Sequence, residues 1–223
     1  MRITGGCFLV GALLTLGASL ASAQNAVDIG IGFGEAWDKS NNTGIDNANS
    51  ANAYGSCVPN SGDPYCQASS SLNGFMLGFG GDIMFKPKFG FGAEFNVEPS
   101  TKAYGPLSDR SMFYDFNGVY EPYATKRVAL MIQGGVGGER TSFSISQSGC
   151  VGNVACSTQV EPVGTDSHFQ VHVGVGVQFF LSHHLFIRPQ FDFHYVPGLK
   201  NDFNSDAVPE ATVIVGFSSG SGK

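Results

Sequence analysis

The sequence predicts an all-β fold, because apolar residues alternate with small or polar ones in many separate stretches. The clearest stretch runs from His168 to Tyr195, where every second residue from Phe169 to Phe179 is valine or phenylalanine. A period of two is typical of strands with one apolar face. The 31 glycines favour the same class, since glycine is unfavourable inside helices. Beyond the N-terminus, no long stretch has helical periodicity.

The alternation predicts eight strands of about 7–11 residues, close to the roughly 9–11 residues that a tilted strand needs to cross a bilayer. They run over residues 27–33, 75–85, 89–97, 112–120, 128–136, 169–179, 185–193 and 211–217. Short and long connections alternate between them. The short turns are residues 86–88, 123–126 and 181–184, and the long polar loops are residues 37–70, 99–109, 144–166 and 197–209. This alternation is typical of outer-membrane barrels, with short periplasmic turns and long extracellular loops.

The N-terminus has the pattern of a signal peptide. Arg2 supplies the positive charge, the run CFLVGALLTL is apolar, and Ala21-Ser22-Ala23 resembles a cleavage site. We therefore expect residues 1–23 to be removed, residues 24–218 to form the barrel and residues 219–223 to form a polar tail. Cys7 falls within the removed segment and has no expected role.

Charge decides which face of the barrel meets lipid. The apolar face is continuous and carries almost no charge, whereas the opposite face is mostly glycine, glutamine, asparagine and carboxylates. Arg188 is the only basic residue well inside a strand, and every lysine falls in a turn, a loop or the terminus. A water-exposed face without lysine is unusual, so the apolar face is expected to point outward into lipid. The alternative is a secreted soluble barrel. The net charge of -6 argues against nucleic-acid binding.

These features resemble the small outer-membrane β-barrel family, the OmpA/OmpX-type barrels, over residues 26–217. The resemblance implies an eight-stranded antiparallel up-and-down transmembrane β-barrel in the outer membrane of a Gram-negative-type bacterium. It also implies contact with outer-membrane lipids and lipopolysaccharide, and help from the insertion machinery and periplasmic chaperones during biogenesis. No cofactor is implied. The chain departs from the family in the polar tail SSGSGK after Phe217.

The interior face is expected to hold a polar network that plugs the lumen. Its candidate members are Asp82, Glu94, Glu98, Asp115, Glu139, His172, Arg188, Asp192 and His194. Arg188 should be paired, because an unpaired buried charge is costly. Asp82 and Glu94 reach a similar depth from their own turns and are the preferred partners. The alternative is a narrow gate whose pairing can switch.

His172 and His194 face inward on adjacent strands near the outer mouth. Depending on the register, His172 faces either His194 or Asp192, which leaves a metal site or an acid–base pair open. Two histidines without a certain third ligand are too few for a metal site. We therefore expect lumen histidines with satisfied hydrogen bonds, no metal site and no catalytic residue.

The long loops carry the remaining candidates. Cys57, Cys66, Cys150 and Cys156 form an even set in an exported chain, which predicts disulfides. Pairing within each loop is the simplest of three connectivities. Trp37 and Tyr54 in the first loop are candidates for recognition of an unknown extracellular ligand.

The sequence thus predicts an integral outer-membrane protein with a structural role or with loop-mediated surface recognition or adhesion. The alternatives are a small channel and an outer-membrane enzyme that modifies lipid A. The enzyme is disfavoured because no histidine lies on the outward face of any predicted strand.

Overall fold

The structure, a computed structural model, describes residues 26–39, 44–46, 56–57, 66–68, 71–104, 107–151, 155–201 and 203–219. The predicted signal peptide, Tyr54 and most of the polar tail lie outside these ranges. Within them, no helix is both long and apolar enough to cross a membrane.

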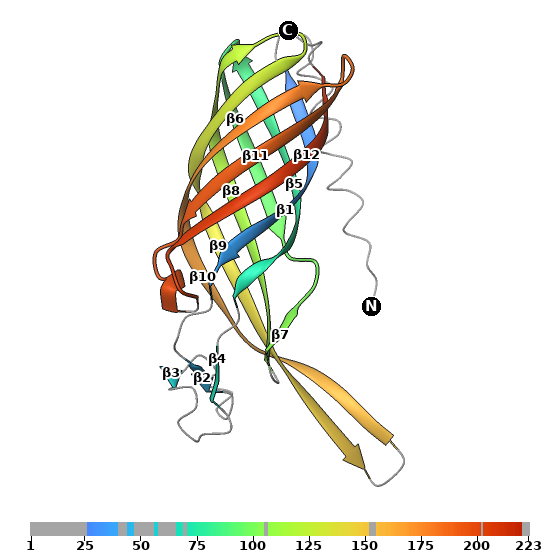
Figure 1. Cartoon of the computed structure of the whole chain (residues 1–223), viewed down its shortest axis with the longest axis vertical. Coiled ribbons are helices and arrows are strands. Elements are labelled where there is room, and N and C mark those ends of the chain that lie inside the picture. Colours follow the sequence, from blue (N-terminus) through green and yellow to red (C-terminus); the bar gives the residue numbers. More distant parts are fainter. Residues whose placement is uncertain are drawn as a thin grey trace.

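Eight long strands form one closed barrel (Figure 1). They are β1 (Val27–Asp38), β5 (Leu72–Lys86), β6 (Phe89–Val97), β8 (Leu107–Ala124), β9 (Val128–Val151), β10 (Ala155–Phe180), β11 (Leu185–Tyr195) and β12 (Ala207–Ser218). Each pairs antiparallel with the next long strand in the chain, and β1 closes the ring by pairing with β12. The predicted eight-stranded antiparallel barrel is therefore confirmed.

The register places apolar residues of neighbouring strands side by side on the outer face. Ile31, for example, is opposite Val215 on one side and Phe79 on the other. All three side chains are exposed, as are Phe91 and Phe116, which are 67% and 68% exposed. The alternate residues are buried inside. The exposed apolar exterior fits lipid and not water. The closure of the barrel fits a bilayer as well, because every backbone polar group in the hydrocarbon core must be paired.

The connections contain more regular structure than the sequence predicts. Residues 144–166, expected as a loop, mostly continue β9 and β10, which have 24 and 26 residues. The extended strands form a hairpin that projects from one end of the barrel (Figure 1). The hairpin was not predicted because its sequence is rich in serine, glycine and glutamine, and its few apolar residues, such as Ile145 and Val160, form no regular alternation. The other predicted loops contain β2 (Gly44–Asp46), β3 (Ser56–Cys57), β4 (Cys66–Ala68), β7 (Lys102–Tyr104) and η1 (Leu199–Asn201).

Two apolar clusters occupy the ends of the lumen. The outer cluster consists of Ala36, Leu72, Met76, Phe113, Val196, Leu199, Phe203 and Val208. Leu199 and Phe203 belong to the β11–β12 connection, which folds over the outer mouth and buries both side chains. Near the short turns, the inner cluster consists of Met84, Val119 and Met131. The centre of the polar interior therefore lies between these two apolar clusters, while buried polar residues such as Asp109 and Glu121 lie near the two ends.

Candidate functional site

The centre of the barrel interior is an ion-pair cluster around Arg188. Arg188 Nη1 donates to Asp82 Oδ2 at 2.7 Å, and Nη2 donates to Glu94 Oε1 at 3.2 Å. Arg188, Asp82 and Glu94 come from β11, β5 and β6, and all three are buried. The arginine thus joins strands on different sides of the barrel, and it contacts the two carboxylates preferred from the sequence.

Two glutamine side chains connect this cluster to Asp192. Gln190 Nε2 lies 3.0 Å from Glu94 Oε2 and 2.9 Å from Asp192 Oδ2. Gln133 Nε2 lies 3.0 Å from Glu94 Oε2 and 3.2 Å from Asp192 Oδ1. A cavity beside Arg188 and Glu94 has a volume of ≈ 10 Å³. That volume holds about one water molecule, so little free space remains at this point beside Arg188 and Glu94.

Asp192 links the arginine cluster to the two histidines. His172 of β10 lies directly opposite His194 of β11, and their rings stack with centroids 4.7 Å apart. His172 Nε2 is 2.9 Å from Asp192 Oδ1, so His172 contacts both of the partners considered from the sequence. His172 Nδ1 is 3.0 Å from Asn117 Oδ1. His194 Nε2 is 3.1 Å from Glu210 Oε2.

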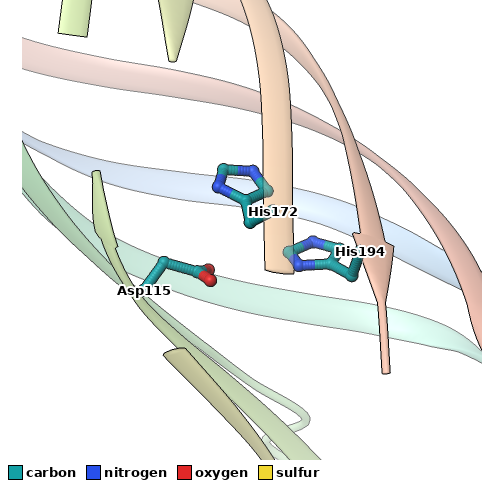
Figure 2. Close-up of side chains that lie close together, drawn as sticks. All are labelled: Asp115, His172 and His194. Carbon is teal, nitrogen blue, oxygen red and sulfur yellow. The ribbon is translucent and has the colours of Figure 1, made fainter. Parts of the chain in front are cut away.

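Asp115 lies beside the histidine pair. Its carboxylate points toward both imidazole rings (Figure 2), and its Oδ1 accepts a hydrogen bond of 2.6 Å from Gln170 Nε2. Asp115 and Gln170 are buried. The site therefore contains two imidazoles and three nearby carboxylates, those of Asp115, Asp192 and Glu210.

The outer part of the polar interior contains the other two predicted acids. Glu98 Oε2 accepts a hydrogen bond of 3.0 Å from the backbone of Ser111, and Glu98 Oε1 lies 2.8 Å from Lys102 Nζ. Glu139 accepts a short hydrogen bond from Thr141.

Sequence reasoning missed several members of the network. Glu210 falls between the predicted loop 197–209 and the predicted strand 211–217 and was assigned to neither, although it is buried on the inward side of β12. The amide side chains of Asn117, Gln133, Gln170 and Gln190 were part of a face identified as polar, but the sequence did not indicate their partners. The two-residue alternation along each strand was the available signal, because each of these polar residues alternates with outward-facing residues.

Asp206 stabilises the turn within the β11–β12 connection, and backbone N–H groups of Ser205 and Asn204 attach this connection to Asp38 and Lys39 at the end of β1. Asp206 Oδ1 accepts backbone hydrogen bonds from Gly198 at 3.0 Å and Lys200 at 3.1 Å. These bonds, that of Lys200 foremost, lower the pKa of Asp206 below its ordinary value of 3.8. We call residues 196–206 the lid, because this segment carries Leu199 and Phe203 into the outer apolar cluster.

The loop candidates are only partly placed. Trp37 is half-exposed near the outer end of β1, where it lines an open hollow of ≈ 580 Å³ with Asp38, Lys39 and Asn204. Tyr54 lies outside the described residues, so the structure does not bring it together with Trp37.

The backbone positions of the cysteines differ between the two predicted pairs. Cys150 and Cys156 are opposite each other in the β9–β10 register. Cys57 lies on β3 and Cys66 on β4, with β2 between these two strands. Strands two positions apart are about 9–10 Å apart, farther than the usual separation of disulfide-linked Cα atoms. Both pairings stay predictions.

Comparison with known proteins agrees with this architecture. The family model of the outer membrane protein beta-barrel domain matches residues 8–218. The chain belongs to this family. It is an integral outer-membrane protein of the Gram-negative type, and the resemblance to small outer-membrane barrels is confirmed. No curated protein matches the sequence.

Solved structures of small outer-membrane barrels are similar to this outer-membrane barrel. Neisserial surface protein A is 11% identical, with a TM-score of 0.51 over 88% of this chain and 96% of that one. Ail, the attachment invasion locus protein of Yersinia pestis, is 14% identical, with a TM-score of 0.47 over 87% and 98%. OprG of Pseudomonas aeruginosa is 11% identical, with a TM-score of 0.44 over 88% and 98%. At these identities the likeness concerns the fold alone.

Proposed function

We propose that this protein is a closed outer-membrane barrel whose extracellular hairpin and loops recognise another surface. The barrel interior serves stability in this proposal, and it neither conducts solutes nor catalyses a reaction. The observation that carries the proposal is the β9–β10 hairpin, which extends beyond the point where β9 and β10 pair with the rest of the barrel.

The hairpin has two unpaired edges. Pairing of β10 with β11 ends at Val171, and pairing of β9 with β8 ends at Ile145. Beyond these residues, β9 and β10 pair only with each other in the described part of the chain. An exposed edge offers a row of backbone donors and acceptors, which an extended segment of another protein can join as an added strand. We therefore propose an extended polypeptide as the ligand of the hairpin.

The hollow beside Trp37 provides a second contact at the outer rim. It combines an aromatic side chain with the charged side chains of Asp38 and Lys39 and the amides of Asn73 and Asn204. Aromatic residues next to polar groups are typical of binding surfaces. We assign this hollow a supporting role in the same recognition.

The lumen supports a structural role for the interior. The cavity beside Arg188 holds about one water molecule, and an apolar cluster lies toward each end of the barrel. A solute that crossed the barrel would have to displace both clusters and the ion pairs of Arg188. This arrangement argues against the small-channel alternative.

The test measures attachment of bacteria that display the protein to wells coated with an extracellular-matrix protein, with heparin-coated wells as a polysaccharide comparison. In the shortened variant, an Asn-Gly turn replaces Ser148–Thr158 and joins Gln147 to Gln159, which are opposite each other in the register. The variant removes the β9 edge beyond Gln147 but keeps residues 159–170 of β10, so it tests β9 as the edge that the ligand joins. We expect attachment to a coated protein to fall to the level of cells without the barrel. Unheated and heated samples should still migrate differently on detergent gels, because the barrel pairs are unchanged.

Deletion of Tyr54–Ser69 serves as the matched comparison, because it shortens a different extracellular segment. Attachment that survives the hairpin change but not this deletion assigns recognition to the first loop. The proposal is contradicted if attachment is unchanged in both variants. It is also contradicted if the parent protein mediates no attachment at all. A changed lipid A mass spectrum in cells with the folded protein would instead support the enzyme alternative.

A further inference from the structure

Three potential metal ligands meet in the polar interior, Asp115, His172 and His194 (Figure 2). They come from β8, β10 and β11, and one ligand atom of each lies within 4.8 Å of the other two. None of the three residues is more than 2% exposed. The sequence predicts that all three side chains face inward, but it does not place Asp115 beside the histidines, since that depends on the register of the closed barrel.

Two atoms of this trio have no hydrogen-bond partner among the described residues. They are Nδ1 of His194 and Oδ2 of Asp115. Buried polar atoms are nearly always satisfied, so a pair of open atoms in one place calls for an additional group. A cation would satisfy both, because each atom offers a lone pair.

The histidines are oriented as in metal sites. Nε2 of His172 contacts Asp192 at 2.9 Å, and Nε2 of His194 contacts Glu210 at 3.1 Å. A metal-binding histidine commonly donates its other ring N–H to a carboxylate, which fixes the tautomer and makes the ligating nitrogen more basic. If Nε2 carries the proton in both rings, Nδ1 carries the lone pair. In that tautomer Nδ1 of His172 cannot donate to Asn117 Oδ1, which lies 3.0 Å away on β8, so a cation between these two acceptor atoms would replace the hydrogen bond.

We propose that Asp115, His172 and His194 form a buried site for a divalent first-row transition metal, with zinc as the best match. Nδ1 of each histidine and the Asp115 carboxylate are the ligands, and Asn117 Oδ1 or a water completes a tetrahedron. Imidazole and carboxylate are common zinc ligands. In a tetrahedral zinc site the ligand atoms lie about 3.3 Å apart, so the side chains close by about an ångström on binding.

The surrounding charges favour this trio over a neighbouring one. Glu94, His172 and Asp192 also lie within metal-binding reach of one another. However, Glu94 is held by Arg188 and Gln190, and Asp192 already accepts several hydrogen bonds. The Asp115 trio has open atoms and two further carboxylates behind its histidines. A divalent cation would offset their negative charge.

The position of the site indicates when the metal enters. The ring of Phe113 packs 4.9 Å from that of His194, and Phe113 belongs to the outer apolar cluster below the lid. The folded barrel therefore shields the site from solvent. The metal enters while the barrel forms and then links β8, β10 and β11 across the lumen.

The test folds the chain, without its predicted signal peptide, in detergent with zinc and then dialyses it against a chelator. Metal is counted by elemental mass spectrometry, and folding is checked by the difference in migration between heated and unheated samples. We expect about one zinc per folded chain, because a buried site releases its metal slowly. Folding with cobalt instead should give the visible absorption bands of a tetrahedral site.

The variants locate the metal. His194→Gln and Asp115→Asn should lose the retained zinc, whereas His183→Gln, in an exposed turn, should keep it. Glu210→Gln should weaken binding about 10–100-fold, because it removes the group that orients His194. If the histidine variant fails to fold, the nearly isosteric Asp115→Asn variant decides. The proposal is overturned if the folded parent protein retains no zinc, or if Asp115→Asn retains as much as the parent.

Discussion

Arg188 shows how a single side chain organises the interior of this barrel. It is the only buried arginine or lysine among the described residues, and it contacts two carboxylates from other strands. Burying a charge is costly unless a partner and further hydrogen bonds compensate it. Here Gln190 donates to the same glutamate, which helps to compensate its charge. The interior therefore depends on Arg188 more than on any surface charge.

Replacing Arg188 with methionine should lower the free energy of unfolding by about 3–5 kcal/mol, because Asp82 and Glu94 lose their cationic partner. Urea titration of the barrel in lipid vesicles measures this change, with the fluorescence of Trp37, the only tryptophan, as the signal. The triple variant Arg188→Met, Asp82→Asn, Glu94→Gln removes all three charges and should recover most of the loss. An unchanged unfolding midpoint in the single variant would show that the carboxylates need no cation.

At the scale of elements, the lid depends on the two backbone hydrogen bonds that Asp206 accepts. Replacing Asp206 with alanine should release the turn around Lys200 and withdraw Leu199 and Phe203 from the outer cluster. Trypsin added to intact cells should then cleave after the exposed Lys200 faster than in the parent protein. Asp206→Asn keeps one acceptor oxygen and should give an intermediate rate. Equal rates in all three proteins would mean that the apolar side chains alone hold the lid.

The same carboxylate predicts how the lid responds to pH. The folded-state pKa of Asp206 lies below its ordinary value of 3.8, because the N–H groups of Lys200 and Gly198 favour the charged form. A lowered pKa adds stability above the unfolded pKa, and this stability is lost as the pH falls through the folded pKa. Hydrogen exchange of the lid, corrected for the intrinsic rate, should therefore be constant between about pH 5 and 8 and rise below about pH 4. Loosening near neutral pH would point to another group.

The elements also show where sequence reasoning succeeds. Strands such as Phe169–Phe179 are predictable, because lipid on one side and a packed lumen on the other impose strict alternation. The lid is not, because Leu199 and Phe203 lie among glycine, lysine and asparagine in a segment without a period. The projecting β9–β10 hairpin is mostly polar in sequence, so its pairing leaves no regular apolar alternation. The trio around Asp115 depends on strand register, which alternation alone does not fix.

At the scale of the whole molecule, the cost of placing a charge on the apolar exterior should depend on its depth in the bilayer. On β8, Phe116 lies midway between Arg110, toward the outer rim, and Tyr123, next to the short turn. Phe116→Arg should destabilise the barrel by about 2–4 kcal/mol, whereas Tyr123→Arg should cost about 0–1 kcal/mol, because only the first places charge at mid-bilayer. Urea titration in vesicles compares the two. Equal losses of unfolding free energy in the two variants would contradict the proposed depth of the barrel in the bilayer.

The layering of the lumen makes a prediction for the barrel as a pore. Planar bilayers that contain the folded protein should show no discrete conductance, because little free space remains beside Arg188 and apolar clusters lie toward both ends of the barrel. Arg188→Ala should stay silent as well, since removing the cation leaves both apolar clusters in place. Discrete openings in the parent protein would contradict a closed lumen. Openings only in Arg188→Ala would show that the ion pairs, rather than the apolar clusters, form the barrier to ions.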